Sequence, residues 1–269
     1  MRRMRSNLRV ATFLAPNLLP VYEFIVDAIG RELGSATELV VGDAFDQFGN
    51  GEIDAGFICG LPYVQLVRQT PVPVELLAAP VICGGRYAGR PIYFSDVIVH
   101  QDSPVRTFAD LRGKSWAYND PDSHSGYNLT RYHLLTMGDT RGFFGRVVKA
   151  GFHQKAMRMV AAGEVDAAAI DSQVLAIELR DHPALADELR VIEALGPSTI
   201  QPVVAARHLP ADLKAALRTA LLRLGDDPAA QKVLARGFVD RFVPVTDGDY
   251  DDIRRMLAAA ERAGFLTLE

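Results

Sequence analysis

The sequence has few cysteines, no long apolar run and no excess of positive charge. Its two cysteines, Cys59 and Cys83, lie in apolar surroundings without the spacing of a metal site, so we expect buried free thiols, with a disulfide as the alternative. The six histidines form no H-x-x-x-H grouping, which speaks against a metal centre. No apolar stretch approaches the roughly 20 residues that a membrane-spanning helix needs.

The net charge of −4 speaks against nucleic acid and anionic membranes as the main partners. With 269 residues, of which 49% are hydrophobic, the chain can bury one large core or two smaller ones. The basic N-terminus is followed by an apolar run, residues 8–14, that is only one strand long, and no small-residue cleavage site follows it. We therefore expect no export signal in the chain as written, which makes a cytoplasmic location the alternative to an exported one.

Apolar runs alternate with apolar residues at helical spacing, which favours parallel α/β sheets with ligands at the carboxyl ends of the strands. Strands are expected over residues 8–14, 38–41, the end of 51–59, 74–81, 91–100, 114–118, 147–148, 167–170, 189–192 and 199–206. Helices are expected over residues 20–30, with an end near Gly34 as a plausible C-cap, from 60 onward, and over 108–111, 127–137, 154–162, 172–180, 211–225, 228–237 and 250–263.

One phrase occurs twice, at 50–58 (Asn-Gly-Glu-Ile-Asp-Ala-Gly-Phe-Ile) and at 162–170 (Ala-Gly-Glu-Val-Asp-Ala-Ala-Ala-Ile). Each copy reads as a helix end, a Gly-Glu turn, an aspartate and an apolar strand, with Asp54 and Asp166 as turn or cap residues. The repeat predicts two equivalent lobes that are joined by extended crossings near 95–102 and 195–203, with a cleft between them. Coincidental use of a common helix-to-strand turn is the alternative.

A polar loop from Asp120 to Gly126 connects the strand at 114–118 with the helix at 127–137. A Ser/Gly-rich loop at a helix N-terminus presents backbone N–H groups and the positive end of the helix dipole to an anion. Ser123 and Ser125 add hydroxyl donors and His124 adds a titratable ring. Because the loop holds no Lys or Arg, it favours reversible capture of an anion over chemistry on it. The alternative is that one serine is simply an N-cap.

Five stretches in this order resemble the substrate-binding proteins of phosphate, phosphite and phosphonate ABC transporters, which have the type II periplasmic-binding-protein fold. These stretches are Asp96–Pro104, Phe108–Lys114, Asp120–Tyr127, Gly151–His153 and Gly163–Asp171.

The resemblance implies an α/β protein of two lobes, each a mostly parallel sheet flanked by helices, with two hinge crossings. Lobe I would comprise residues 1–97 and 199–269, and lobe II, which carries the oxyanion loop, residues 98–198. Such a protein closes on its ligand by hinge motion and delivers it to an ABC transporter permease. No catalysis, no cofactor and no nucleic acid partner are expected. By resemblance the chain would be a periplasmic monomer.

The resemblance also implies roles for single residues. The Ser123–Gly126 loop is similar to the family's oxyanion clamp, which uses hydroxyls and helix-start amides. His153 is similar to a further donor to the oxyanion, unless it caps its own helix. Tyr93 is similar to the family's cleft tyrosine, although core packing on a half-buried strand is equally open.

Two further assignments are less direct. Asp171 falls near the position where aminophosphonate binders place a carboxylate for the ligand's amine; the alternative is an N-cap of the next helix. Phe45 or Phe48 would supply an aromatic wall. The chain departs from the family pattern at His124, where many relatives have a small hydroxyl residue, and at Phe152, which replaces the usual serine.

Two rival functions stay open at this point. An enzyme on the same fold, such as a lyase of cofactor or quinone biosynthesis, would use His124, His153 and Asp171 as acids and bases. A ligand sensor would pass its closure to a partner protein through an exposed apolar patch on the C-terminal helices.

Overall fold

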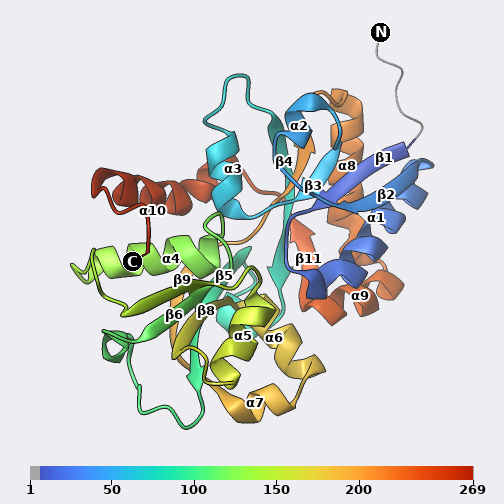
Figure 1. Cartoon of the computed structure of the whole chain (residues 1–269). Coiled ribbons are helices and arrows are strands. Elements are labelled where there is room, and N and C mark those ends of the chain that lie inside the picture. Colours follow the sequence, from blue (N-terminus) through green and yellow to red (C-terminus); the bar gives the residue numbers. More distant parts are fainter. Residues whose placement is uncertain (1–6, 269) are drawn as a thin grey trace. The chain divides into compact units, whose positions relative to one another are not determined.

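The computed structural model describes residues 7–268 (Figure 1). These residues form two compact units. The chain up to Ile92 together with Thr199–Tyr250 makes the first unit, and Tyr93–Ser198 together with the chain from Asp251 onward makes the second. The chain therefore passes between the units at three points, after residues 92, 198 and 250.

Unit 1 contains a six-stranded mixed sheet in the order β11-β4-β10-β3-β1-β2. β1 runs parallel to β2 and β3, whereas β10 is antiparallel to β3 and β4, and β11 is antiparallel to β4. The strands are β1 (Asn7–Thr12), β2 (Ala36–Val41), β3 (Ala55–Phe57), β4 (Val74–Ile82), β10 (Val203–Ala206) and β11 (Val239–Val243). The α-helices are α1 (Leu19–Leu33), α2 (Gln47–Asn50), α3 (Gly60–Leu66), α8 (Ala211–Arg223) and α9 (Pro228–Leu234).

Unit 2 contains a five-stranded sheet in the order β7-β6-β8-β5-β9. β6 runs parallel to β7 and β8, and β5 is antiparallel to β8. The strands are β5 (Ile92–His100), β6 (Ser115–Tyr118), β7 (Arg146–Lys149), β8 (Ala167–Asp171) and β9 (Leu189–Thr199). The α-helices are α4 (Leu129–Thr136), α5 (His153–Ala161), α6 (Ser172–Asp181), α7 (Ala184–Glu188) and α10 (Asp251–Arg262).

The expected alternation of strands and helices is confirmed, but the sheets are mixed rather than mostly parallel. Strands that directly follow a crossing between the units, such as β5 and β10, are antiparallel to neighbouring strands: β5 to β8 and β10 to β3. We also expected only helices over residues 211–263, whereas the structure has the strand β11 there, which pairs with β4 at the edge of the unit 1 sheet.

Local signals account for much of this architecture. In α1 the apolar residues recur on one face, where Val21, Ile25 and Ile29 are buried, and the helix ends at Gly34 with a φ of 58°. A backbone position in the left-handed region favours glycine, so Gly34 ends the helix where the sequence predicts. In unit 2, Trp116 is fully buried and stacks on Phe144 with ring centroids 4.7 Å apart, which fixes β6 in the core.

The repeated phrase has the same structural role in both units. The Asp54 carboxylate accepts a hydrogen bond from the Arg9 N–H of β1 at 2.9 Å. The Asp166 carboxylate accepts one from the Ser115 N–H of β6 at 2.7 Å. Each aspartate thus ties the turn before one strand to the start of the neighbouring parallel strand.

The C-terminal residues lie in a different unit from the one we expected. We placed residues 199–269 in lobe I, yet the chain from Asp251 onward packs within unit 2. Ile253 and Leu257 of α10 are buried, and Phe265 and Leu268 belong to the same hydrophobic core as Trp116. Apolar burial against that core, which no local pattern encodes, decides the assignment. The first crossing also lies earlier than expected, after Ile92.

Both cysteines are free, but neither is fully buried, which corrects that part of the expectation. Cys59 is half-buried, and Cys83 is exposed where β4 gives way to a glycine-rich turn. Within residues 7–268, none of the helices combines the length and the apolar character that crossing a bilayer would require. The same residues contain no cluster of three or more metal-ligating side chains.

Candidate functional site

The site begins at one edge of the unit 2 sheet. The parallel strands β7, β6 and β8 lie side by side, and each leads into a helix. The helices that follow them begin after Ser123, Phe152 and Asp171. Because parallel strands end at a common edge of the sheet, the three helix N-termini follow one another along that edge. Helix N-termini carry unpaired N–H groups and partial positive charge, so this edge favours an anion.

The loop after β6 closes onto its own helix. The Ser123 hydroxyl accepts a hydrogen bond from the Gly126 N–H at 3.0 Å, and the Ser123 carbonyl accepts one from the Asn128 N–H at 3.1 Å. The second bond gives residues 124–128 a wide π-helical turn before α4. Ser123 is therefore the N-cap, which was the alternative reading. A hydroxyl that accepts one hydrogen bond can still donate one.

Gly126 is required by a close approach. A Cβ atom on this residue would lie 2.0 Å from Asn119 Oδ1 and 3.2 Å from His153 Cε1. The first of these distances is shorter than any normal contact. A side chain at position 126 would therefore displace either the Asn119 side chain or the loop.

Ser125 and His153 meet at this edge. The Ser125 hydroxyl lies 3.2 Å from His153 Nε2, and the Ser125 carbonyl accepts a hydrogen bond from the Ser95 hydroxyl at 2.7 Å. Both side chains are buried. Burial lowers the pKa of His153 to about 4, although the Ala169 backbone acts in the opposite direction. At neutral pH the ring is uncharged, and it faces Ser125 rather than capping its own helix.

His124 has a different environment from the one the sequence indicated. Its Nε2 lies 2.7 Å from the Ser198 hydroxyl, and its Nδ1 lies 3.1 Å from the side-chain nitrogen of Asn128. Burial lowers the pKa of His124 to about 4, with Asp252 raising it and Arg131 lowering it. Both ring nitrogens are engaged within unit 2.

The remaining predicted residues are placed as follows. Tyr93 is buried, and its ring centroid lies 6.3 Å from that of His124. Asp171 Oδ1 accepts hydrogen bonds from the Gln173 and Val174 N–H groups, so Asp171 caps α6. Phe45 belongs to unit 1, where it stacks on Phe13 with ring centroids 4.5 Å apart.

The predicted Ser123–Gly126 loop, His153, Tyr93 and Asp171 therefore all belong to unit 2. Phe48, the alternative aromatic residue, is buried in unit 1.

Sequence reasoning missed the polar residues that support the loop. The Ser95 hydroxyl donates to the Ser125 carbonyl of the loop, and the Ser172 hydroxyl accepts a hydrogen bond at 3.1 Å from the N–H of Phe94, the residue before Ser95. A serine within the apolar run 91–100 was the available signal, because a fully buried hydroxyl needs a partner. Asn128 and Ser198, the partners of His124, carried no such signal.

Comparison with known proteins places these features in context. Residues 11–250 match the family model described as "ABC transporter, phosphonate, periplasmic substrate-binding protein". The phosphonates-binding periplasmic protein of Escherichia coli K12 is 29% identical over 153 residues, which are 55% of this chain but only 45% of that protein. The matched stretch thus spans less than half the length of this curated relative.

Two solved structures share the fold. One is a binding protein component of an ABC phosphonate transporter from Pseudomonas aeruginosa, with a TM-score of 0.84 and 20% identity over 97% of this chain and 88% of that one. The other is PhnD1 from Prochlorococcus marinus in complex with methylphosphonate, with a TM-score of 0.83 and 18% identity over 96% of this chain and 98% of that one. The type II periplasmic-binding-protein fold expected from the sequence is confirmed.

Proposed function

The chain belongs to the family of periplasmic substrate-binding proteins of phosphonate ABC transporters, and on this basis we propose that it captures a small phosphonate- or phosphate-like oxyanion at the carboxyl edge of the parallel strands of unit 2. The contact between Ser125 and His153 carries this proposal, because it joins two of the three helix N-termini and, when the His153 ring donates to Ser125, leaves the serine hydroxyl to donate a hydrogen bond to the anion. Ser123, Ser125 and the first-turn amides after Ser123 would hold the oxyanion, and His153 would act through the Ser125 hydroxyl that it orients.

The neutral state of the donors explains why binding would be reversible. Residues 119–126 contain no Lys or Arg, and burial keeps the His153 ring uncharged at neutral pH. When the His153 proton is on Nε2, that N–H donates to Ser125 Oγ and leaves the serine hydrogen for the ligand. A ligand that lacks one oxygen leaves a buried donor unpaired, at a cost of about 1–3 kcal/mol. Such differences give selectivity without fixed positive charge.

We also propose roles for Asp171, Tyr93 and Phe45 in recognising the rest of the ligand. Asp171 would meet the amine of an aminophosphonate with the carboxylate that caps α6, and Tyr93 would contribute its hydroxyl. Phe45 would pack against an organic substituent. Closure by hinge motion, a monomeric state and delivery to a membrane permease also stay predictions. The family is periplasmic, and we propose that location for this chain.

The rival of a lyase on the same fold is not retained. The family's members are binding proteins of a transporter, not enzymes. The geometry agrees with this, since both ring nitrogens of His124 are engaged by neighbours and Asp171 caps a helix. Two of the three residues in that acid–base set, His124 and Asp171, are thus engaged in contacts that hold the fold.

A ligand panel tests the proposal. Thermal unfolding and calorimetric titration would be measured with phosphate, phosphite, methylphosphonate, 2-aminoethylphosphonate, sulfate, taurine and small carboxylates. A ligand at a hundred times its Kd should stabilise the protein by about 2.7 kcal/mol, which raises the Tm by several degrees. Ser125→Ala should abolish the shift. Thr219→Val, which removes an exposed hydroxyl that bonds its own helix, should keep it. No shift with any oxyanion would refute the proposal.

A further inference from the structure

A chain of buried hydrogen bonds passes through His124. Arg131 donates to Asn128 Oδ1 at 2.8 Å, and Asn128 Nδ2 lies 3.1 Å from His124 Nδ1. On the other side of the ring, His124 Nε2 lies 2.7 Å from the Ser198 hydroxyl, which donates to Asp252 Oδ2 at 2.6 Å. Arg131, Asn128, His124 and Ser198 are each no more than 5% exposed. All five residues belong to unit 2.

Arg131 and Asp252, at the two ends of this hydrogen-bond series, fix which group donates in each bond between them. A guanidinium can only donate, so the amide oxygen of Asn128 must face Arg131 and its nitrogen must donate to His124 Nδ1. The ring proton therefore lies on Nε2 and donates to Ser198, whose own hydrogen points at the Asp252 carboxylate. Each bond polarises the next from the cation to the anion, which strengthens the series as a whole.

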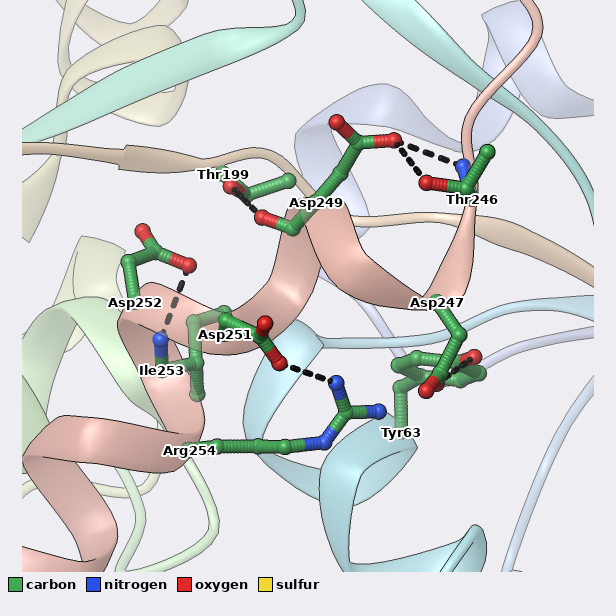
Figure 2. A network of polar contacts seen from close by, with 9 residues as sticks. All are labelled: Tyr63, Thr199, Thr246, Asp247, Asp249, Asp251, Asp252, Ile253 and Arg254. Atoms are coloured by element: carbon green, nitrogen blue, oxygen red, sulfur yellow. Dashed lines mark hydrogen bonds and ion pairs between the residues drawn. The ribbon is translucent and has the colours of Figure 1, made fainter.

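Three members of this hydrogen-bond series lie at the loop or where the polypeptide crosses between the units. His124 is the first residue of the helical turn that follows Ser123. Ser198 is the last residue of unit 2 before the chain passes to unit 1 at Thr199. Asp252 follows Asp251, where the chain re-enters unit 2 and α10 begins. In Figure 2, Asp252 also accepts a hydrogen bond from the Ile253 N–H, whereas Asp251 pairs with Arg254.

We propose that His124 is a positioning residue that couples the Ser123–Gly126 loop to two of the three segments where the chain crosses between the units. Its ring does not contact the ligand; it holds the first turn of the loop helix against Ser198 and, through Ser198, against Asp252. Because such coupling is reciprocal, an anion that orders the loop also orders the two crossing segments. The role of the ligand in this statement rests on the proposed function, but the coupling itself does not.

The coupling is tested first without ligand, by amide hydrogen exchange in Ser198→Ala and Asp252→Ala. In both variants the amides of residues 124–127 should exchange about tenfold faster, while those of the core strands β6 and β8 keep their rates. Asp251→Ala is the matched control, because this neighbouring carboxylate pairs with Arg254 in a largely exposed position. It should leave the loop unchanged.

A double variant tests whether Ser198 and Asp252 act on the loop through one connected series of hydrogen bonds or independently of each other. Ser198→Ala already breaks the link between His124 and Asp252, so adding Asp252→Ala should not speed exchange of the loop any further. Additive effects, or a loop that exchanges at the wild-type rate in both single variants, would overturn the coupling.

Titration with methylphosphonate then links the coupling to binding. Ser198→Ala should raise the Kd about tenfold, and Asp251→Ala should not change it. If the wild-type protein binds none of the oxyanions, the proposed function fails while the exchange data still decide the coupling. If Ser198→Ala exchanges faster in the loop but binds with the wild-type Kd, the coupling does not serve binding and this inference is wrong.

Discussion

Ser125 Oγ and His153 Nε2 lie 3.2 Å apart, although 28 positions separate the two residues in the chain. They meet because β6 and β7 are parallel neighbours whose carboxyl ends lead into the helices that carry them. The sheet thus places a hydroxyl and a neutral imidazole at adjoining helix N-termini. The same edge carries the Ser123 cap and the glycine that lets the loop approach Asn119.

Substitution of Gly126 should show how tightly this loop is packed. Gly126→Ala places a methyl group 2.0 Å from Asn119 Oδ1, and we expect a loss of about 1–3 kcal/mol in the free energy of unfolding, measured by urea denaturation. Gly49→Ala, where the added methyl group meets open space, is the control and should be close to neutral. Wild-type stability in Gly126→Ala would show that the Asn119 side chain or the loop gives way at little cost.

The two buried histidines should make the protein less stable in mild acid. Burial lowers the pKa of His124 and of His153 to about 4, whereas an unfolded histidine titrates near 6.5. Between these values the unfolded state binds the protons and the folded state does not, so stability falls as the pH decreases. Each ring should contribute up to about 1.4 kcal/mol per pH unit.

Urea denaturation at pH 7, 6 and 5 would measure this slope above the range in which most carboxylates titrate. His153→Gln, which removes one of the two fully buried rings, should reduce the slope by the share of that ring, up to about 1.4 kcal/mol per pH unit. A stability that stays constant or rises between pH 7 and pH 5 would contradict the assignment of neutral, buried rings.

The tautomer of His124 provides a test of the polarised hydrogen-bond series that is read on the wild-type protein. Nitrogen-15 NMR of the histidine rings at pH 7 should show His124 with its proton on Nε2, because Asn128 donates to Nδ1. Assignment is made by the loss of the signal in His124→Gln. A proton on Nδ1 would mean that the Asn128 amide is reversed, and the directed series would then be wrong.

The repeated aspartates should have similar energetic roles in the two units. Asp166 accepts hydrogen bonds from both the Ser115 N–H and the Ser115 hydroxyl, and Asp54 accepts one from the Arg9 N–H. Asp166→Ala and Asp54→Ala should each cost about 1–2 kcal/mol in chemical denaturation. Asp187→Ala on the exposed face of α7 should stay within about 0.5 kcal/mol of the wild type. Equal stability of all three variants would refute the shared role.

The sequence by itself determined the local structure and the character of the loop. Apolar spacing predicted α1 and its end at Gly34, and the order of strand, Ser/Gly loop and helix predicted an anion-binding helix start around Ser123. These features were predictable because they depend on residues only a few positions apart. The repeated phrase likewise indicated two related sheets, each with an aspartate in an equivalent turn.

Only the tertiary structure decided which of these residues meet. It joined Ser125 to His153, and it engaged the His124 ring with Ser198, which lies 74 positions away. It also placed α10 in unit 2 and turned strands such as β5 against their neighbours. Strand order, the direction of each crossing and burial against a shared core are properties of the whole chain. No local pattern of residues encodes them, so a titratable ring that looked like a ligand contact proved to be bound on both sides within the fold.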